Sequence, residues 1–179
     1  ADPTEKSEPA ISWGGTNWLV VWTEEIENVN RLRATRVSEA GVVMDANSLE
    51  VCANTAAQRN AAVSWNGVNW LVVWEDFRAS GTYVPHIFGM RVTPQGNMLD
   101  GNGLAISDAD AVLRDPDVAW GGTSWLVVWL RDNSGPRLYG GRVMPDGSLL
   151  DTSEGFNFEA PLGTGLASKP RAAWGQANW

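Results

Sequence analysis

The sequence contains few of the residues that most catalytic and metal sites require. Its 179 residues include one cysteine, Cys52, and one histidine, His86. A single cysteine excludes a disulfide within the chain, and no Cys/His spacing typical of a zinc site occurs. A histidine-based catalytic triad could use only His86. Neither a Gly-x-Ser-x-Gly elbow nor a sialidase-type Ser-x-Asp-x-Gly-x-x-Trp box is found.

Long apolar runs and clustered positive charges are also missing. The longest apolar cores are four-residue WLVV segments, whereas a membrane helix needs roughly 20 residues, so we expect no membrane insertion. The formal net charge is −8, and no Lys/Arg cluster offsets it, which argues against a nucleic-acid partner. The scarcity of lysine and the abundance of Asn and Gly are typical of an extracellular or cell-surface protein.

Tryptophan, in contrast, is abundant and strictly repeated. The motif occurs as ISWGGTNWLVVW, VSWNGVNWLVVW and VAWGGTSWLVVW, and a fourth copy begins as AAWGQANW at the end of the chain. These copies account for all 11 tryptophans. Repetition at strand positions favours packing between repeats over a sugar-stacking platform.

A second repeated segment follows each tryptophan motif. It occurs as RLRATRVSEAGVVMD, HIFGMRVTPQGNMLD and RLYGGRVMPDGSLLD. The shared arginines are Arg36, Arg91 and Arg142, and the shared aspartates are Asp45, Asp100 and Asp151. We expect each arginine to make a structural contact, with the aspartate of the same or the neighbouring blade, that ties the third and fourth strands together. The alternative is an anion-binding ring, which would need the arginines to face the central channel.

Each repeat predicts four short antiparallel strands. The WLVVW segment is apolar on both faces and must therefore be covered on both sides. No helical period is found. Four strands in about 50 residues, stacked on their neighbours, predict an all-β β-propeller: three four-stranded blades plus the first strand of a fourth, a partial ring. The pattern W-x-G-x-x-W-L-V-V-W…R-V…G-x-x-L-D resembles tryptophan-rich, kelch-like repeats of secreted bacterial proteins.

The resemblance covers residues 9–179 and implies these boundaries. Blade 1 spans about 9–60, blade 2 about 61–115, blade 3 about 116–170, and blade 4 starts at 171–179. We expect residues 1–8 to be a leader or an artificial end. Because propellers typically need four to eight blades, we expect self-association or further blades of a longer protein to complete the ring.

Two groups of residues outside the repeat are candidate sites. The segment SDADAVLRDPD clusters carboxylates that suit calcium, although the spacing is not that of an EF-hand and a solvated acidic loop is the alternative. Those carboxylates are Asp108, Asp110, Asp115 and Asp117. The variable loops after the second strand of each blade are expected to gather on one ligand-binding face. Its candidates are Glu24, Glu25, Glu75, Asp76, Arg78, Tyr83, Arg131 and Asp132.

Catalysis in a propeller usually requires polar residues where the innermost strands enter the channel. Here these positions are mostly small, and Asp117 is the one carboxylate among them. A lone carboxylate offers no partner for acid–base work. The sequence therefore predicts a non-catalytic module for protein interaction or assembly, with no resident cofactor. The alternative is a carbohydrate-binding or carbohydrate-active propeller that uses the variable-loop face for a glycan.

Overall fold

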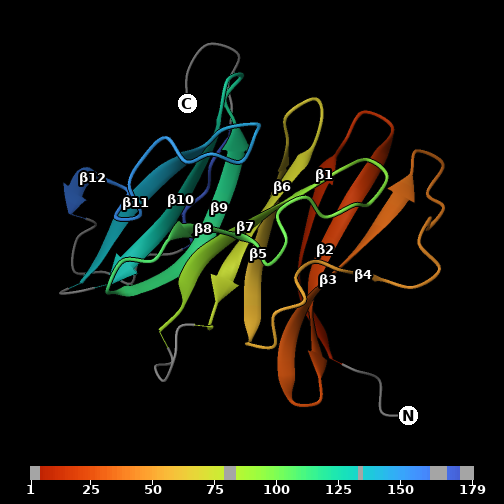
Figure 1. The fold of residues 1–179 in the computed structure, drawn as a ribbon, viewed down its shortest axis with the longest axis horizontal. Coiled ribbons are helices and arrows are strands. Elements are labelled where there is room, and N and C mark those ends of the chain that lie inside the picture. The colour runs from red at the N-terminus through yellow and green to blue at the C-terminus, as the bar shows by residue number, and fades with distance from the viewer. Residues whose placement is uncertain (1–4, 79–83, 133–134, 162–168, 174–179) are drawn as a thin grey trace.

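The computed structural model describes residues 5–78, 84–132, 135–161 and 169–173. The described elements are all β-strands, and they form three four-stranded antiparallel sheets that lie side by side in Figure 1. Within these residues no helix could cross a membrane. The first sheet contains β1 (Lys6–Trp13), β2 (Asn17–Ile26), β3 (Val29–Ser38) and β4 (Leu49–Glu50). The second contains β5 (Gln58–Trp65), β6 (Trp70–Asp76), β7 (His86–Val92) and β8 (Leu104–Ser107). The third contains β9 (Val112–Trp120), β10 (Trp125–Asp132), β11 (Pro136–Val143) and β12 (Phe156–Pro161).

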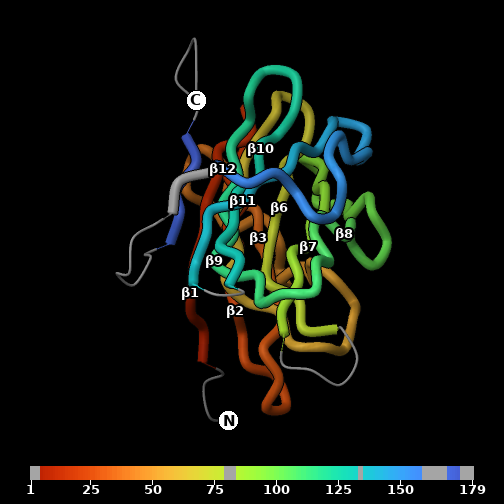
Figure 2. The backbone as a smooth tube through the Cα atoms, turned by 90° about the vertical axis from the view of Figure 1, so that its left-hand side faces the viewer, coloured from red at the N-terminus to blue at the C-terminus, as the bar shows by residue number. Residues whose placement is uncertain are grey.

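Each sheet is one blade, and its strands follow chain order from the first strand to the fourth. The first strands lie together, because β1 contacts β5 and β5 contacts β9. In Figure 2 the view is onto the third blade, with the other two behind it. β1 begins at Lys6, inside the segment that the sequence assigned to a leader, and Ser7 pairs with Thr23 of β2.

The tryptophans pack the blades against one another, as the repeat predicts. Trp70 and Trp74 of blade 2 and Trp125 and Trp129 of blade 3 are fully buried. The indole Nε1 of Trp70 donates to the carbonyl of Ser12 in the preceding blade at 3.2 Å. Trp125 makes the equivalent bond to Ser64 at 3.2 Å. The predicted core role is therefore confirmed for blades 2 and 3, while Trp174 and Trp179 lie outside the described residues.

Each repeated arginine pairs with the aspartate of its own blade, but the expectation that the pair joins the third and fourth strands is wrong. The aspartates lie in the turn after the third strand, and the fourth strands begin later, at Leu49, Leu104 and Phe156. Arg36 donates from its backbone, Nε and Nη2 to the carboxylate of Asp45, with Nη2 at 2.6 Å from Oδ1. Burial raises the pKa of Asp45, but the hydrogen bonds from Arg36 outweigh burial and hold this pKa below its usual range. The same pairing joins Arg91 to Asp100 and Arg142 to Asp151. These pairs fasten the turn after the third strand onto that strand.

Candidate functional site

The first strands of all three blades carry an irregularity at the same place. The pairing shifts between Ser7 and Ala10 in β1, between Arg59 and Ala62 in β5, and opposite Val128–Leu130 in β9. At these bulges Glu8, Asn60 and Asp115 have φ angles of 52°, 54° and 53°. Each lies five residues before the leading tryptophan of its repeat.

Left-handed backbone at a residue other than glycine costs about 1–3 kcal/mol and recurs at functional sites. Bulges also redirect side chains, and they are common beside active sites. Three such residues at equivalent positions therefore mark this end of the inner strands as a candidate site.

The bulges surround a pocket of about 230 Å³ at the centre of the arc. Its lining includes the carboxylates of Glu8, Asp115 and Asp117, and the cations Lys169 and Arg171. The remaining lining is Asn60 and small or aliphatic residues of the inner strands and of the 169–171 segment. A small pocket with three acidic and two basic side chains can hold polar ligands and can transfer protons.

Two carboxylates hold the bulges of neighbouring blades in register. Glu8 of blade 1 accepts hydrogen bonds from Thr23 Oγ1 and from the backbone N–H of Asn60, both at 2.8 Å. Glu75 of blade 2 is 1% exposed, and its Oε1 accepts from Asn60 Nδ2 and from the backbone N–H of Asp115, both at 2.8 Å. Each carboxylate thus reaches the bulge of the next blade.

The remaining polar contacts connect the pocket to the 169–172 segment. Lys169 Nζ donates to Asn60 Oδ1 at 2.9 Å and lies 3.9 Å from Asp115 Oδ1. Asp117 Oδ2 accepts from the backbone N–H of Ala172 at 2.7 Å. Lys169 is five residues before Trp174, so it occupies in the fourth repeat the position that Glu8, Asn60 and Asp115 occupy in the others.

Replacing Glu75 with alanine should lower the free energy of unfolding by about 3 kcal/mol, because it leaves the partly buried donors of Asn60 and Asp115 without their acceptor. Glu154→Ala is the matched control, since Glu154 is a 59% exposed carboxylate paired with Arg131, and such pairs are worth about 1 kcal/mol or less. Urea denaturation of both variants measures the difference. Equal midpoints for the two variants would contradict the conclusion that Glu75 stabilises the bulges at Asn60 and Asp115.

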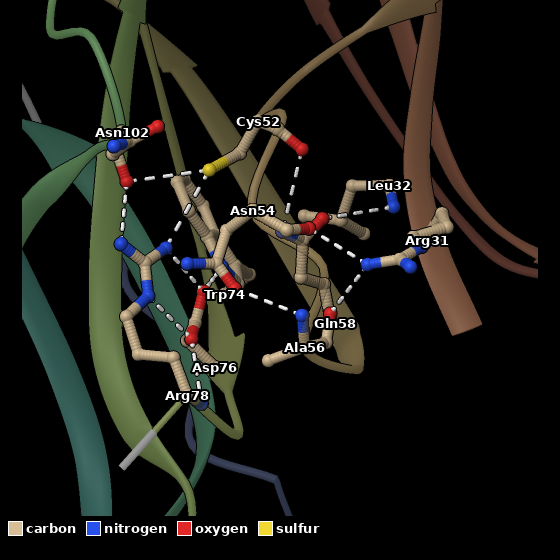
Figure 3. A network of polar contacts seen from close by, with 10 residues as sticks. All are labelled: Arg31, Leu32, Cys52, Asn54, Ala56, Gln58, Trp74, Asp76, Arg78 and Asn102. Atoms are coloured by element: carbon tan, nitrogen blue, oxygen red, sulfur yellow. Dashed lines mark hydrogen bonds and ion pairs between the residues drawn. The ribbon is translucent and has the colours of Figure 1, made fainter. Parts of the chain in front are cut away.

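The predicted ligand-binding face consists largely of residues engaged within the blades. Asp76 is fully buried and accepts from Trp74 Nε1 at 2.9 Å and from Arg78 Nη2 at 2.6 Å. Arg78 lies over the ring of Phe88 and donates to the carbonyl of Asn102 at 2.7 Å. Figure 3 shows Asp76 and Arg78 in a network that also includes Cys52, which lies in the connection between blades 1 and 2 and accepts from Arg78 Nη2.

The other members of that face are distributed among the blades. Glu24 forms ion pairs with Lys6 and Arg33 in blade 1. In blade 3, Arg131 pairs with Glu154 and Asp132 with Arg114. Glu25 is exposed at the end of β2, and Tyr83 lies outside the described residues. Of this predicted set, Glu75 contacts the pocket residues Asn60 and Asp115 directly.

The four aspartates predicted as calcium ligands do not come together. Asp108 and Asp110 are exposed between β8 and β9, whereas Asp115 and Asp117 line the central pocket. In the described part of the chain, no group of three or more His, Cys, Asp or Glu side chains could hold a metal ion. The separation arises because β9 begins at Val112 and carries the last two aspartates into the inner strand.

Sequence reasoning missed most of the pocket. The predicted blade boundaries put Glu8 in the leader and leave Asn60 and Lys169 at blade ends, because they start the inner strands three or four positions later than β1, β5 and β9 begin. The available signal was the spacing, since a polar residue precedes each leading tryptophan by five positions.

Three four-stranded antiparallel blades with their first strands around a central pocket define a β-propeller, seen here as a partial ring. No protein-family model matches the chain, and no curated protein matches it. Among solved structures, one is a member of the GH130 family of mannoside phosphorylases, which contains glycoside hydrolases that target beta-1,2 mannosidic linkages in Candida mannan. It aligns with a TM-score of 0.54 and 8% identity over 82% of this chain and 51% of its own.

The GH43 endo-arabinanase from Bacillus licheniformis aligns with a TM-score of 0.52 and 12% identity, covering 85% of this chain and 56% of its own. The chain thus spans about half the length of the structures it resembles. At such identities the likeness establishes the fold. Both neighbours are carbohydrate-active enzymes, and this finding overturns the prediction of a non-catalytic interaction module and the prediction that the chain is not an enzyme.

Proposed function

We propose that this chain belongs to a carbohydrate-active β-propeller that cleaves glycosidic bonds in the central pocket. The observation that carries the proposal is the convergence of Glu8, Asp115 and Asp117 on one pocket at the bulged ends of the inner strands. Glycoside cleavage uses two carboxyl groups, one that protonates the leaving oxygen and one that acts as base or nucleophile. The pocket therefore has more acidic groups than the reaction requires.

Asp117 is the carboxylate that the fold requires least. The equivalent positions in blades 1 and 2 are Ala10 and Ala62, so an acidic residue is not needed to form the inner strand. Asp115 and Glu8, in contrast, also serve the bulges. We assign Asp117 as the first candidate for the reaction, with Glu8 or Asp115 as its partner and with Lys169 and Arg171 as donors to sugar hydroxyl groups.

The substrate is proposed from the neighbours. One belongs to a family that targets beta-1,2 mannosidic linkages, and the other is an endo-arabinanase, so mannosides and arabinans are the first substrates to test. Two cations in the pocket would also suit inorganic phosphate as the attacking group, as in a phosphorylase. The tryptophan-rich, kelch-like identity of the repeats and the extracellular location stay predictions from the sequence.

The test is to incubate the chain with beta-1,2-mannooligosaccharides and with arabinooligosaccharides, with and without inorganic phosphate, and to separate the products by chromatography. We expect shortened oligosaccharides, accompanied by a sugar phosphate if the reaction is phosphorolysis. Calorimetry on the same mixtures measures binding. Saturable binding without any product would contradict the enzymatic proposal and favour a lectin-like propeller.

A further inference from the structure

Glu75 is a buried carboxylate at a position where the blade itself does not require one. It directly follows the last tryptophan of the second repeat, and the residues at this position in blades 1 and 3 are Thr23 and Leu130. All three are buried, with at most 2% of each residue exposed. Because a buried carboxylate costs free energy unless it is paired and hydrogen-bonded, local contacts must account for Glu75 in blade 2.

The hydrogen bonds of Glu75 join it to two bulges. Its Oε2 accepts from Arg59 Nε at 3.0 Å, and its Oε1 accepts from Asn60 Nδ2 and from the backbone N–H of Asp115, both at 2.8 Å. Asn60 belongs to the bulge of blade 2 and Asp115 to the bulge of blade 3. Glu75 is not in the lining of the pocket that the described residues form, so its influence on the pocket passes through these neighbours.

The backbone of Asp115 requires such support. Its φ of 53° is in the left-handed region, and the residue precedes Pro116, a position at which the proline ring favours extended backbone. A residue in a strained conformation persists only where its surroundings over-determine that conformation. The bond from the Asp115 N–H to the buried Glu75 supplies this constraint, and it thereby fixes the direction in which the Asp115 side chain leaves the strand.

Glu75 also orients the amide of Asn60. While Nδ2 of Asn60 donates to Glu75, its Oδ1 accepts from Lys169 Nζ at 2.9 Å. The same ammonium group lies 3.9 Å from Asp115 Oδ1. The four residues therefore form a closed circuit of contacts, in which Asn60, Lys169 and Asp115 line the pocket and Glu75 lies behind them.

We propose that Glu75 is a positioning residue, which holds Asp115 in place as the carboxylate that acts together with Asp117. The inference rests on the proposed function and specifies the second carboxylate of that reaction. A reacting group that is misplaced by about 1 Å can lose about 10²-fold in rate. A buried, hydrogen-bonded support behind Asp115 is therefore expected to affect kcat.

The contacts favour Asp115 over Glu8 as the partner of Asp117. Glu8 Oε2 already accepts from Thr23 Oγ1 and from the backbone N–H of the next bulge. In blade 3 the equivalent backbone N–H is held by Glu75 instead. The Asp115 carboxylate is therefore turned toward the pocket and Lys169.

Two substitutions of Glu75 test the proposal on the oligosaccharide that the wild-type chain cleaves. Leucine fills the space as Leu130 does in blade 3 but accepts no hydrogen bond, whereas glutamine retains an oxygen for Asn60 and Asp115. Glu75→Leu should lower kcat by about 10²-fold at unchanged KM, and Glu75→Gln should retain most of kcat. Glu154→Gln, at a 59% exposed carboxylate, is the control and should leave kcat unchanged. Circular dichroism checks that every variant is folded at the assay temperature.

A double-mutant cycle with Asp115→Asn separates positioning from stability. If Glu75 acts through the Asp115 carboxylate, Glu75→Leu should cause no further fall in kcat once that carboxylate has become an amide. A purely structural Glu75 would lower the melting temperature and leave the kcat of the folded chain unchanged. That result would overturn the proposal, and so would losses that multiply in the double variant.

Hydrogen exchange of the Asp115 amide distinguishes failure of this inference from failure of the proposed function. The amide should exchange slowly in the wild-type chain and in Glu75→Gln, and at least about tenfold faster in Glu75→Leu. If the wild-type chain cleaves neither substrate, the proposed function fails, while this difference in exchange would still support Glu75 as the residue that holds Asp115 in the pocket. Equal exchange in the two variants would overturn the inference whatever activity is found.

Discussion

Replacing Asp117 with asparagine should lower kcat/KM for the cleaved oligosaccharide by about 10²–10⁴, the usual contribution of a positioned acid or base. Asparagine retains an oxygen that can accept the backbone N–H of Ala172, which Asp117 holds at 2.7 Å. The 169–172 segment and the shape of the pocket should therefore persist while the carboxylate charge is lost. For a group that acts in the reaction step, the fall should be in kcat rather than in KM.

The control for this substitution is Asp108→Asn. Asp108 is an exposed aspartate of the same acidic segment, but it lies outside the pocket. It should retain full kcat/KM, and both variants should melt within a degree or two of the parent chain. A rise in KM at constant kcat would show that Asp117 contributes only to ligand binding. Unchanged kinetics in Asp117→Asn would remove this residue from the reaction.

The fold could be predicted from the sequence because its determinants are repeated. The tryptophans at equivalent positions meet equivalent surroundings in each internal interface, so the pattern that predicts a blade also predicts its packing. The Arg–Asp pairs could be predicted for the same reason, because both residues recur at fixed positions. Arg36 and Arg91 also donate to the backbone carbonyls of Pro94 and Pro145 in the next blade. These bonds could not be predicted, since a carbonyl acceptor does not depend on the residue type.

The candidate site was largely hidden for the opposite reason. Its positions are repeated, but its residue types are not: the bulge holds Glu8, Asn60 and Asp115, and the corresponding residue of the fourth repeat is Lys169. A search for identical residues therefore passes over them. Glu75 was assigned to a variable loop because it follows WLVVW, yet it is buried in β6 beneath two bulges.

Acidic residues close in sequence were also poor guides to proximity. Asp108 and Asp110 alternate with the buried Ala109 and Ala111, and they face solvent before β9 begins. Asp115 belongs to the bulge, and it shares the pocket with Asp117 of its own strand and with residues of the other two blades. Only the curvature of the arc, which no local pattern encodes, brings Glu8 and Asp117 to one pocket.

The substitution with the largest expected effect on stability is Gly14→Val. A Cβ atom at this position would lie 2.0 Å from Trp70 Cζ2 and 2.6 Å from Trp70 Cε2. Trp70 is fully buried and its Nε1 is bonded to Ser12, so the ring cannot move aside without separating blades 1 and 2. Overpacking of this kind costs about 3 kcal/mol or more.

Gly121→Val is the matched variant, because Gly121 has the same position in the hairpin of blade 3. Gly121 borders a cavity of about 480 Å³ whose described lining contains no tryptophan, so added methyl groups meet no buried indole among the described residues. Denaturation should show a loss of about 1 kcal/mol or less, because the β-propensity of valine offsets part of any strain. Comparing the two variants separates the cost of backbone strain in the hairpin from the cost of a clash with the tryptophan of the next blade. Equal destabilisation would mean that the glycine serves the turn itself. A large loss at Gly14 alone would mean that the ring of Trp70 excludes a side chain at this position of blade 1, although the equivalent residue of blade 2 is Asn66.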